Sequence, residues 1–390
     1  MRTSYIGADV DSKMTHLTID TGRGKRLRCA VPTTIPALKA VLASAPGRKL
    51  LTFEEGPMAQ WLYRNLKGVV DELIVCDPRR NRLISGDGDK ADPIDADKLA
   101  ELLRGRHLRA VHHSDDDRRV LLKEWVSLYH DRVREAVRQV NKIRARCRMH
   151  GLRPPRGSLR NEAIWDGWLK GLRRHPVAGQ LRVLWMGLAV NRRQSRMARE
   201  RLGRLSRRWP VVAAWQEVPG VGLIRAVTLF AYLDTPWRFA RPKKLWKYCG
   251  IGLLRRASGT DRRGRPKPGT LQLAYQVNRR LKDVVAGASL SAIRQGNNVF
   301  SEYHQRLLGK GIYAANAWHA VARKMLTVLW GMWKTGGRFE PGYVCAVPGK
   351  AQAKNQDTGS RKSQDLAAGS SSRRSSNRGT GRSSRTSSCL

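Results

Sequence analysis

Acidic residues at the ends of predicted strands are the first group in this sequence that could do chemistry. Asp9 ends the apolar run YIGADV, and Glu54 ends the run LLTFEEGP. A carboxylate at a strand end, with Gly7 nearby, can project into a cleft, and two such ends support each other. Asp11 competes with the first acid and Glu55 with the second. The ordinary alternative is that these acids cap turns or are solvated charges.

A second acidic group lies in the segment DKADPIDADKLAELL. Asp92 and Asp95 are three residues apart at the start of a predicted helix, so they share one face. Pro93 disfavours helical geometry at Asp92, which places Asp92 just before the helix and Asp95 in its first turn. Either residue could simply be an N-cap. Together with Asp9 and Glu54, they form a ligand set for one or two Mg²⁺ ions, because hard divalent cations take oxygen ligands and leave positions for phosphate oxygens.

A serine in a basic loop is a candidate nucleophile. Ser258 lies beside Gly259 in KYCGIGLLRRASGTDRRGRPK. A serine hydroxyl is a poor nucleophile unless a base or a metal assists it. Guanidinium groups could hold a phosphate against it and stabilise charge on the phosphoryl oxygens. The alternative is a phosphate-binding loop with an incidental serine. The arginines of this loop are Arg255, Arg256, Arg262, Arg263 and Arg265.

A glycine-rich turn precedes that loop. The segment VPGVGLIRAVTLFAYL is similar to a helix-hairpin-helix element, in which glycines such as Gly220 and Gly222 let backbone amides approach a DNA phosphate. An ordinary tight turn between two helices would have the same sequence.

The composition favours a folded protein with a polyanionic partner. The 390 residues contain 75 Lys and Arg against 31 Asp and Glu, a net charge of +44, and 41% are hydrophobic. Nucleic acid is the first partner to consider, ahead of a membrane surface or a purely structural role. No run of about 18 apolar residues and no signal peptide is recognised, so we expect a cytoplasmic protein. Six well-separated cysteines without a CxxC pair indicate neither a zinc site nor a disulfide framework.

The predicted elements place the acids and the serine in different regions. Strands are expected at 4–10, 17–20, 27–31, 50–54 and 72–76, and helices at 35–45, 58–66 and 95–103, which indicates a mixed α/β sheet covered by helices. A long amphipathic helix is expected from 117, a second helix over 178–205, and a mostly helical region over 210–345. The segment 350–390 has a charge of +7 and a composition typical of disorder, so +37 remains elsewhere. The apolar stripe of the first long helix consists of Leu122, Val126, Tyr129, Val133, Val137, Val140 and Cys147.

These motifs, in this order, resemble a known family. GADVDSK, FEEGP and KADPIDADKLAELL are similar to the three acidic blocks of the DEDD transposases of bacterial insertion sequences, the family numbered one-ten, described as bridge-RNA-guided recombinases. The resemblance continues through PGVG, FARPKKLWKYCGIGLLRRASG, NRRLK, NVFSEYHQRLLGKG and AVARKML, and it covers residues 4–335. The segment GRPKPGTLQLAYQ departs from the commoner form.

The resemblance implies a fold and a division of the chain. It implies a ribonuclease-H-like, RuvC-like domain over 1–110 and a coiled-coil arm over 111–209. A transposase domain over 210–345 and a tail over 346–390 would follow.

The same resemblance implies a mechanism. The acidic tetrad would be Asp9, Glu54, Asp92 and Asp95, holding Mg²⁺, and Ser258 would attack DNA to form a 5′-phosphoserine. The partners would be target and donor DNA, a non-coding guide RNA and further copies of the chain, as a dimer or tetramer at the bacterial nucleoid. A Holliday-junction-type nuclease using water and a non-catalytic binding protein remain as alternatives.

Overall fold

The computed structural model describes residues 2–22, 24–78, 92–256, 270–273 and 277–345. Within its first 76 residues, the chain forms a five-stranded sheet of order β3-β2-β1-β4-β5. The pairs β1–β2 and β2–β3 are antiparallel, whereas β1–β4 and β4–β5 are parallel. This confirms the predicted mixed sheet. The strands are β1 (Thr3–Val10), β2 (Met14–Asp20), β3 (Leu27–Pro32), β4 (Arg48–Glu54) and β5 (Glu72–Cys76).

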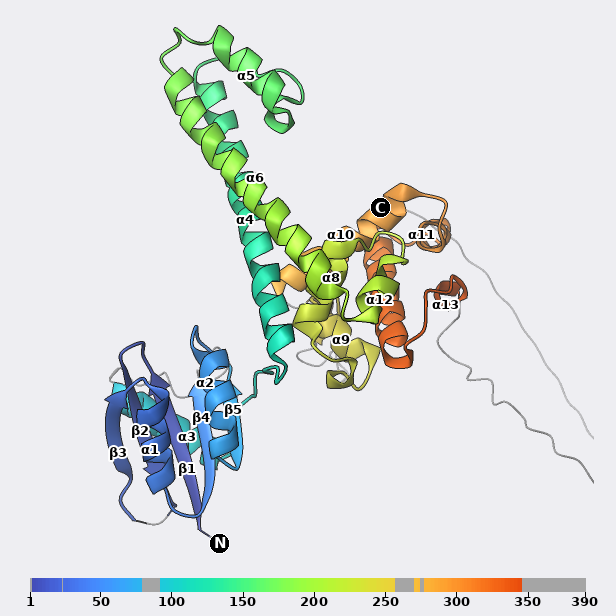
Figure 1. The fold of residues 1–390 in the computed structure, drawn as a ribbon. Helices are drawn as coiled ribbons and strands as arrows, with labels where there is room; N and C mark the ends of the chain where they lie inside the picture. Colours follow the sequence, from blue (N-terminus) through green and yellow to red (C-terminus); the bar gives the residue numbers. More distant parts are fainter. Residues whose placement is uncertain (1, 23, 79–91, 257–269, 274–276, 346–390) are drawn as a thin grey trace, which may run out of the picture. The chain divides into compact units, whose positions relative to one another are not determined.

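Helices cover both faces of the sheet (Figure 1). Helices α1 (Ile35–Ser44) and α2 (Ala59–Leu66) pack on the face that bears Ile6 and Phe53, in one hydrophobic cluster. Helix α3 (Asp92–Arg104) packs on the opposite face, so tightly that a Cβ on Gly7 would lie 2.2 Å from the carbonyl oxygen of Ala96. The helix begins three residues earlier than predicted, because Pro93 is accommodated in its first turn.

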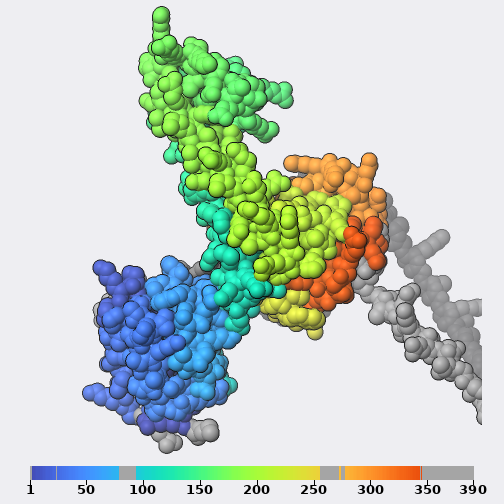
Figure 2. Space-filling model, in the orientation of Figure 1, coloured from blue at the N-terminus to red at the C-terminus, as the bar shows by residue number. Residues whose placement is uncertain are grey.

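Two long helices follow the sheet. Helix α4 (Asp117–Met149) begins at the N-cap Asp116, whose side chain accepts a hydrogen bond from the backbone N–H of Arg118, and α6 (Ala178–Ser206) packs along it (Figure 1). Figure 2 shows the two helices in contact along their length. Val137, expected in the apolar stripe, is 53% exposed. That single expectation is wrong, because α6 covers a narrower face of α4 than the predicted apolar stripe occupies.

A separate cluster fills one end of the α4–α6 pair. There η3 (Ser158–Arg160) and α5 (Glu162–Gly171) fold back, and the rings of Trp165 and Trp185 stack with centroids 4.8 Å apart.

The region after α6 is mostly helical, as predicted, and it also contains a two-stranded sheet, β6–β7, that was not predicted. Its core includes Trp215, Phe230 and Met325, together with Leu122 and Leu202 from the long helices. No helix in the described ranges is long and apolar enough to cross a membrane. The elements are α7 (Pro210–Gln216), α8 (Leu223–Leu233), η4 (Pro236–Arg238), α9 (Pro242–Tyr248), β6 (Leu253–Arg256), β7 (Thr270–Leu273), α10 (Arg279–Gln295), α11 (Val299–Gly309), α12 (Ala314–Thr335) and α13 (Gly342–Cys345).

Candidate functional site

The sheet brings two of the predicted acids to neighbouring strand ends. In the parallel β1–β4 pair, Gly7 lies opposite Thr52, and Ala8 lies opposite Phe53. The next positions along the two strands are Asp9 and Glu54. Because side chains alternate along a strand, Asp9 lies on the same face as Gly7, and Glu54 lies on the same face as Thr52. This is the face that α3 covers.

The direction of α3 brings a third acid toward the same end of the sheet. The side chain of Thr18, which pairs with Gly7, donates to Asp97 at 2.6 Å. Seven residues later, Arg104 donates to Asp20 at 3.0 Å, near the start of β1. Helix α3 therefore runs antiparallel to β1, and its first turn, with the half-buried Asp95, points toward the end where Asp9 lies.

The three acids have the chemistry of hard-cation ligands, but the structure does not bring their carboxylates together. All are carboxylates, and they approach one edge of the sheet from β1, β4 and α3. Among the residues that the structure describes, no group of three or more His, Cys, Asp or Glu is close enough to hold a metal ion. Asp92 begins α3, but its side chain lies outside the described part.

The neighbouring acids are engaged elsewhere. The Oε2 atom of Glu55 lies 2.7 Å from Nε2 of His113. Asp97 accepts from Arg28 and Thr18, and the hydrogen bond from Arg28, opposed by partial burial, lowers the pKa of Asp97. In the β1–β2 turn, hydrogen bonds from the backbone N–H groups of Ser12 and Lys13 lower the pKa of Asp11. Glu54 is thus the glutamate on the face of Asp9.

The hairpin β6–β7 carries the loop with the predicted nucleophile. Ser258, Arg262, Arg263 and Arg265 lie in 257–269, outside the described residues, as do the side chains of Arg255 and Arg256. The base of the hairpin is described, and three of the sequence motifs meet there. Gly250 has φ +74°, and a Cβ on Gly252 would lie 2.7 Å from the backbone nitrogen of Lys247, so both positions need glycine.

Arg323 bonds this base, and Asn278 follows Val277, whose side chain a Cβ on Gly250 would meet at 2.7 Å. Nη1 of Arg323 on α12 donates to the carbonyl oxygen of Ile251 at 3.3 Å, and burial lowers the pKa of this guanidinium. The side chain of Asn278 caps α10 by accepting from the backbone N–H of Leu281 at 3.1 Å. Arg323 lies in AVARKML and Asn278 in NRRLK, so residues of both motifs lie at the described base of the hairpin.

The two glycines of the α7–α8 turn have different surroundings. A Cβ on Gly220, which has φ +82°, would lie 2.2 Å from the carbonyl oxygen of Ala288, so this glycine is needed for packing against α10. Gly222 is exposed at the N-cap of α8, and a Cβ there would meet nothing within 4 Å. Of the two, Gly222 is the glycine with open space beside it, at the start of α8.

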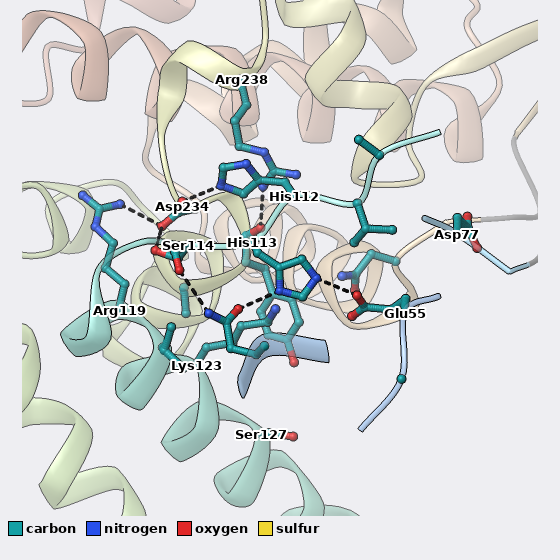
Figure 3. Close-up of a pocket in the computed structure, with 18 of the residues that line it drawn as sticks. Glu55, Asp77, His112, His113, Ser114, Arg119, Lys123, Ser127, Asp234 and Arg238 are labelled. Atoms are coloured by element: carbon teal, nitrogen blue, oxygen red, sulfur yellow. Dashed lines mark hydrogen bonds and ion pairs between the residues drawn. The ribbon is translucent and has the colours of Figure 1, made fainter. Parts of the chain in front are cut away.

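A polar cavity of about 760 Å³ contains functional groups that the sequence did not reveal (Figure 3). Asp234 adopts φ +64° and accepts hydrogen bonds from His112 at 2.6 Å and Ser114 at 3.1 Å. Burial opposes its ionisation, but these bonds and the charge of Arg119 hold the pKa of Asp234 below its ordinary value. The neighbouring His113 binds Glu55. The sequence His112-His113-Ser114 can be recognised, but no sequence pattern predicts its contact with Asp234, which lies 122 residues after His112.

Two family models match separate segments of the chain. Residues 6–148 match the DEDD model of the IS110 family, described as "Transposase", and residues 212–305 match the model described as "Transposase IS116/IS110/IS902 family". The protein "Putative transposase y4qE" of Sinorhizobium fredii (strain NBRC 101917 / NGR234) is 28% identical over 232 residues. These residues are 56% of this chain and 54% of that protein, so the chain spans about half the length of this relative.

The matched segments contain the residues singled out above. The first includes Asp9, Glu54, Asp92 and Asp95, and the second includes Gly220, Gly222 and Ser258. Residues 6–148 and 212–305 are therefore similar, one after the other, to two domains of IS110-family transposases.

Proposed function

We propose that this protein is the transposase of an insertion sequence and that it cuts and rejoins DNA strands by serine attack on a phosphodiester. The observation that carries the proposal is the convergence of Asp9, Glu54 and the first turn of α3 at one edge of the sheet. Residues 1–110 would be a RuvC-like domain, 111–209 a coiled-coil arm, 210–345 the transposase domain and 346–390 a tail.

Asp9, Glu54, Asp92 and Asp95 would hold Mg²⁺. When bound, the ion supplies Lewis-acid polarisation of a phosphoryl oxygen. The protein's own contribution would be to direct carboxylates from three elements toward one edge of the sheet, with α3 held to the sheet by the contact at Gly7 and by the Asp97–Thr18 hydrogen bond.

Ser258 would be the nucleophile. Its Oγ forms a bond to phosphorus, the bond from phosphorus to the 3′ oxygen breaks, and the proton lost by the serine is balanced by the proton gained by the released 3′ oxygen. A 5′-phosphoserine remains. When another 3′ hydroxyl attacks its phosphorus, the bond to Oγ breaks, the strands are rejoined and the serine hydroxyl is restored by the proton that the attacking hydroxyl loses. The loop arginines at 255, 256, 262, 263 and 265 would stabilise charge on the phosphoryl oxygens.

The proposed partners are target and donor DNA, a non-coding guide RNA and further copies of the chain, as a dimer or tetramer in the bacterial nucleoid. The net charge of +44 supports polyanion binding. In a guided system, base pairing reads the sequence while the protein reads shape and backbone.

A covalent-adduct assay tests the proposal. The full chain is incubated with Mg²⁺, RNA transcribed from the flanks of its element and end-labelled DNA, then denatured and resolved by electrophoresis. We expect a protein–DNA adduct that disappears in Ser258→Ala, in Asp9→Asn and with a chelator. Thr260 carries the nearest other side-chain hydroxyl in the loop, so Thr260→Ala is the matched control and should retain the adduct.

A metal-dependent nuclease that uses water is the second candidate. It is favoured by the match of residues 6–148 to a DEDD transposase model, since metal-bound carboxylates can equally activate a water molecule. Cleavage without an adduct, at the same rate in wild type and Ser258→Ala, would establish this nuclease and exclude serine attack.

A further inference from the structure

A second cavity, of about 750 Å³, lies between α4, α8 and α10, and the proposed catalytic residues do not line it. Its lining is rich in arginine: Arg134 from α4, Arg225 from α8, and Arg279 and Arg280 from α10. Asp283 is the one acid among the lining residues. Asp131, just outside the lining, lies 3.1 Å from Arg134 and 3.4 Å from Arg280. The cavity therefore keeps an excess of positive charge.

Of the four arginines that line the cavity, Arg225 is the one whose charge would gain most from a bound anion. Its Nη1 donates to the carbonyl oxygen of Gly220 at 2.6 Å and to the hydroxyl of Ser291 at 2.9 Å, so these partners are neutral. Among the described residues, no carboxylate pairs with it, and burial alone lowers its pKa. A partly buried cation without a counter-charge costs free energy, which a bound anion would recover.

The surrounding backbone leaves room beside this guanidinium. A Cβ on Gly287 of α10 would lie 3.2 Å from Nη2 of Arg225, a contact that a small shift of this flexible side chain relieves, whereas a side chain longer than that of alanine would enter the cavity at this point. Ile224, in the first turn of α8, also lines the cavity. The N-cap of α8 is Gly222, which supplies no side-chain acceptor to the N–H groups of this turn.

We propose that this cavity binds one phosphodiester group of a nucleic-acid backbone, held by Arg225 and Arg279. Guanidinium groups from separate helices suit the several oxygens of a phosphate better than a single carboxylate. This inference rests on the proposed function only for the identity of its ligand, because a transposase must hold nucleic acid. It assigns a binding role to arginines outside the Ser258 loop.

Nucleic-acid binding measured in the presence of a chelator tests this site without cleavage. Affinity for a DNA duplex and for an RNA of the same length is measured at several KCl concentrations. Arg279→Gln should weaken binding several-fold and reduce the slope of log affinity against log salt by about one. Gly287→Leu should weaken binding without changing the charge. The matched controls are Arg294→Gln, on the same helix outside the cavity, and Gly287→Ala.

A loss of affinity in Arg279→Gln and Gly287→Leu supports the site. Whether the loss is seen with DNA, with RNA or with both identifies the nucleic acid that binds there. The site is rejected if Arg279→Gln binds like Arg294→Gln, or if folded Gly287→Leu binds like Gly287→Ala. Because no cleavage is needed, failure here leaves the adduct assay unaffected, and failure of the adduct assay leaves this measurement valid.

His130, which lines the cavity, provides an independent spectroscopic readout. Burial and the charge of Arg280 lower its pKa to about 4. In protein with ¹³C-labelled histidine, an oligonucleotide bound in the cavity should raise this pKa by cancelling that charge. Inorganic phosphate is the comparison probe: a rise with both ligands indicates a general phosphate site, and a rise with the oligonucleotide alone indicates a polymer backbone. No rise with either contradicts the proposal.

Discussion

The adjacent glutamates Glu54 and Glu55 at the end of β4 have different surroundings, so substituting each one in turn can distinguish their roles. Glu54 shares the face of Asp9, whereas Glu55 binds His113 at 2.7 Å. We expect Glu54→Gln to reduce cleavage at least about 100-fold, because a metal ligand should matter no less than the outer-shell partners whose loss costs about 10–100-fold. Glu55→Gln should retain most activity, since an amide can still bond the imidazole.

The measurement for this pair is initial cleavage rate against Mg²⁺ concentration for both variants. A raised Mg²⁺ requirement in Glu54→Gln alone agrees with the assignment. Equal losses in the two variants, or a greater loss in Glu55→Gln, would contradict it.

His130 should make the fold sensitive to acid. Its pKa is lowered from 6.5 to about 4, first by burial and then by Arg280, and its Nε2 lies 2.9 Å from the hydroxyl of Thr228. Because the unfolded chain binds this proton near pH 6.5 and the folded chain only near pH 4, the free energy of unfolding falls as the pH drops through this window. The lowered pKa corresponds to a loss of at most about 3 kcal/mol.

Urea unfolding at pH 7 and pH 4.5 measures this effect. His130→Gln cannot titrate, so its stability should fall less between the two pH values than that of the wild type. Parallel losses in both proteins would show that other groups cause the acid sensitivity.

At the scale of elements, the packing of α3 on β1 controls the approach of the acids. A Cβ on Gly7 would lie 2.2 Å from a backbone oxygen of α3, so Gly7→Ala must displace the helix. We expect a loss of about 1–3 kcal/mol in the free energy of unfolding, together with reduced cleavage. Gly56→Ala is the control, because a Cβ there meets nothing within 4 Å. Denaturant midpoints check the expectation, and equal midpoints for the two variants would refute it.

The elements were largely predictable from the sequence because their apolar periods are local. The five strands and the long helices appear where the pattern indicated, with shifts of up to three residues, as at β2, where the Asp11–Met14 turn extends the pairing to Met14. The hairpin β6–β7 was missed because its four-residue strands are too short to show a period.

The sites were predictable only in part, for a related reason. The positions of Asp9 and Glu54 at neighbouring strand ends could be predicted because each ends an apolar run. The hydrogen bonds of Asp234 with His112 and Ser114 join residues more than 100 positions apart, and the apolar periodicity of a sequence cannot predict such long-range contacts. The cavity beside Arg225 likewise depends on three helices that meet only in the folded chain.

At the scale of the whole molecule, the positive charge is spread over the folded elements. Helix α4 carries ten Lys and Arg against four acids, and α6 carries seven Arg against one acid. Deleting residues 346–390 should therefore leave most of the nucleic-acid affinity and the melting temperature unchanged, since +37 of the +44 lies before residue 350. Salt-dependent binding of the truncated chain tests this, and a collapse of affinity at about 0.1 M salt would assign the main contact to the tail.

Helix α4 contributes side chains to two separate cores. Leu122 and Val126 belong to the core of the C-terminal helices, and Ile143 and Cys147 to the cluster around Trp165. Each residue added to a helix rotates everything beyond it by about 100°. The length of the α4–α6 pair can therefore change only in steps of whole helical turns. An insertion of about seven residues in both α4 and α6 keeps the side chains of both cores pointing in their original directions. One extra residue in α4 alone would rotate its distal side chains away from α6. Relatives of different reach should differ by near-whole numbers of turns.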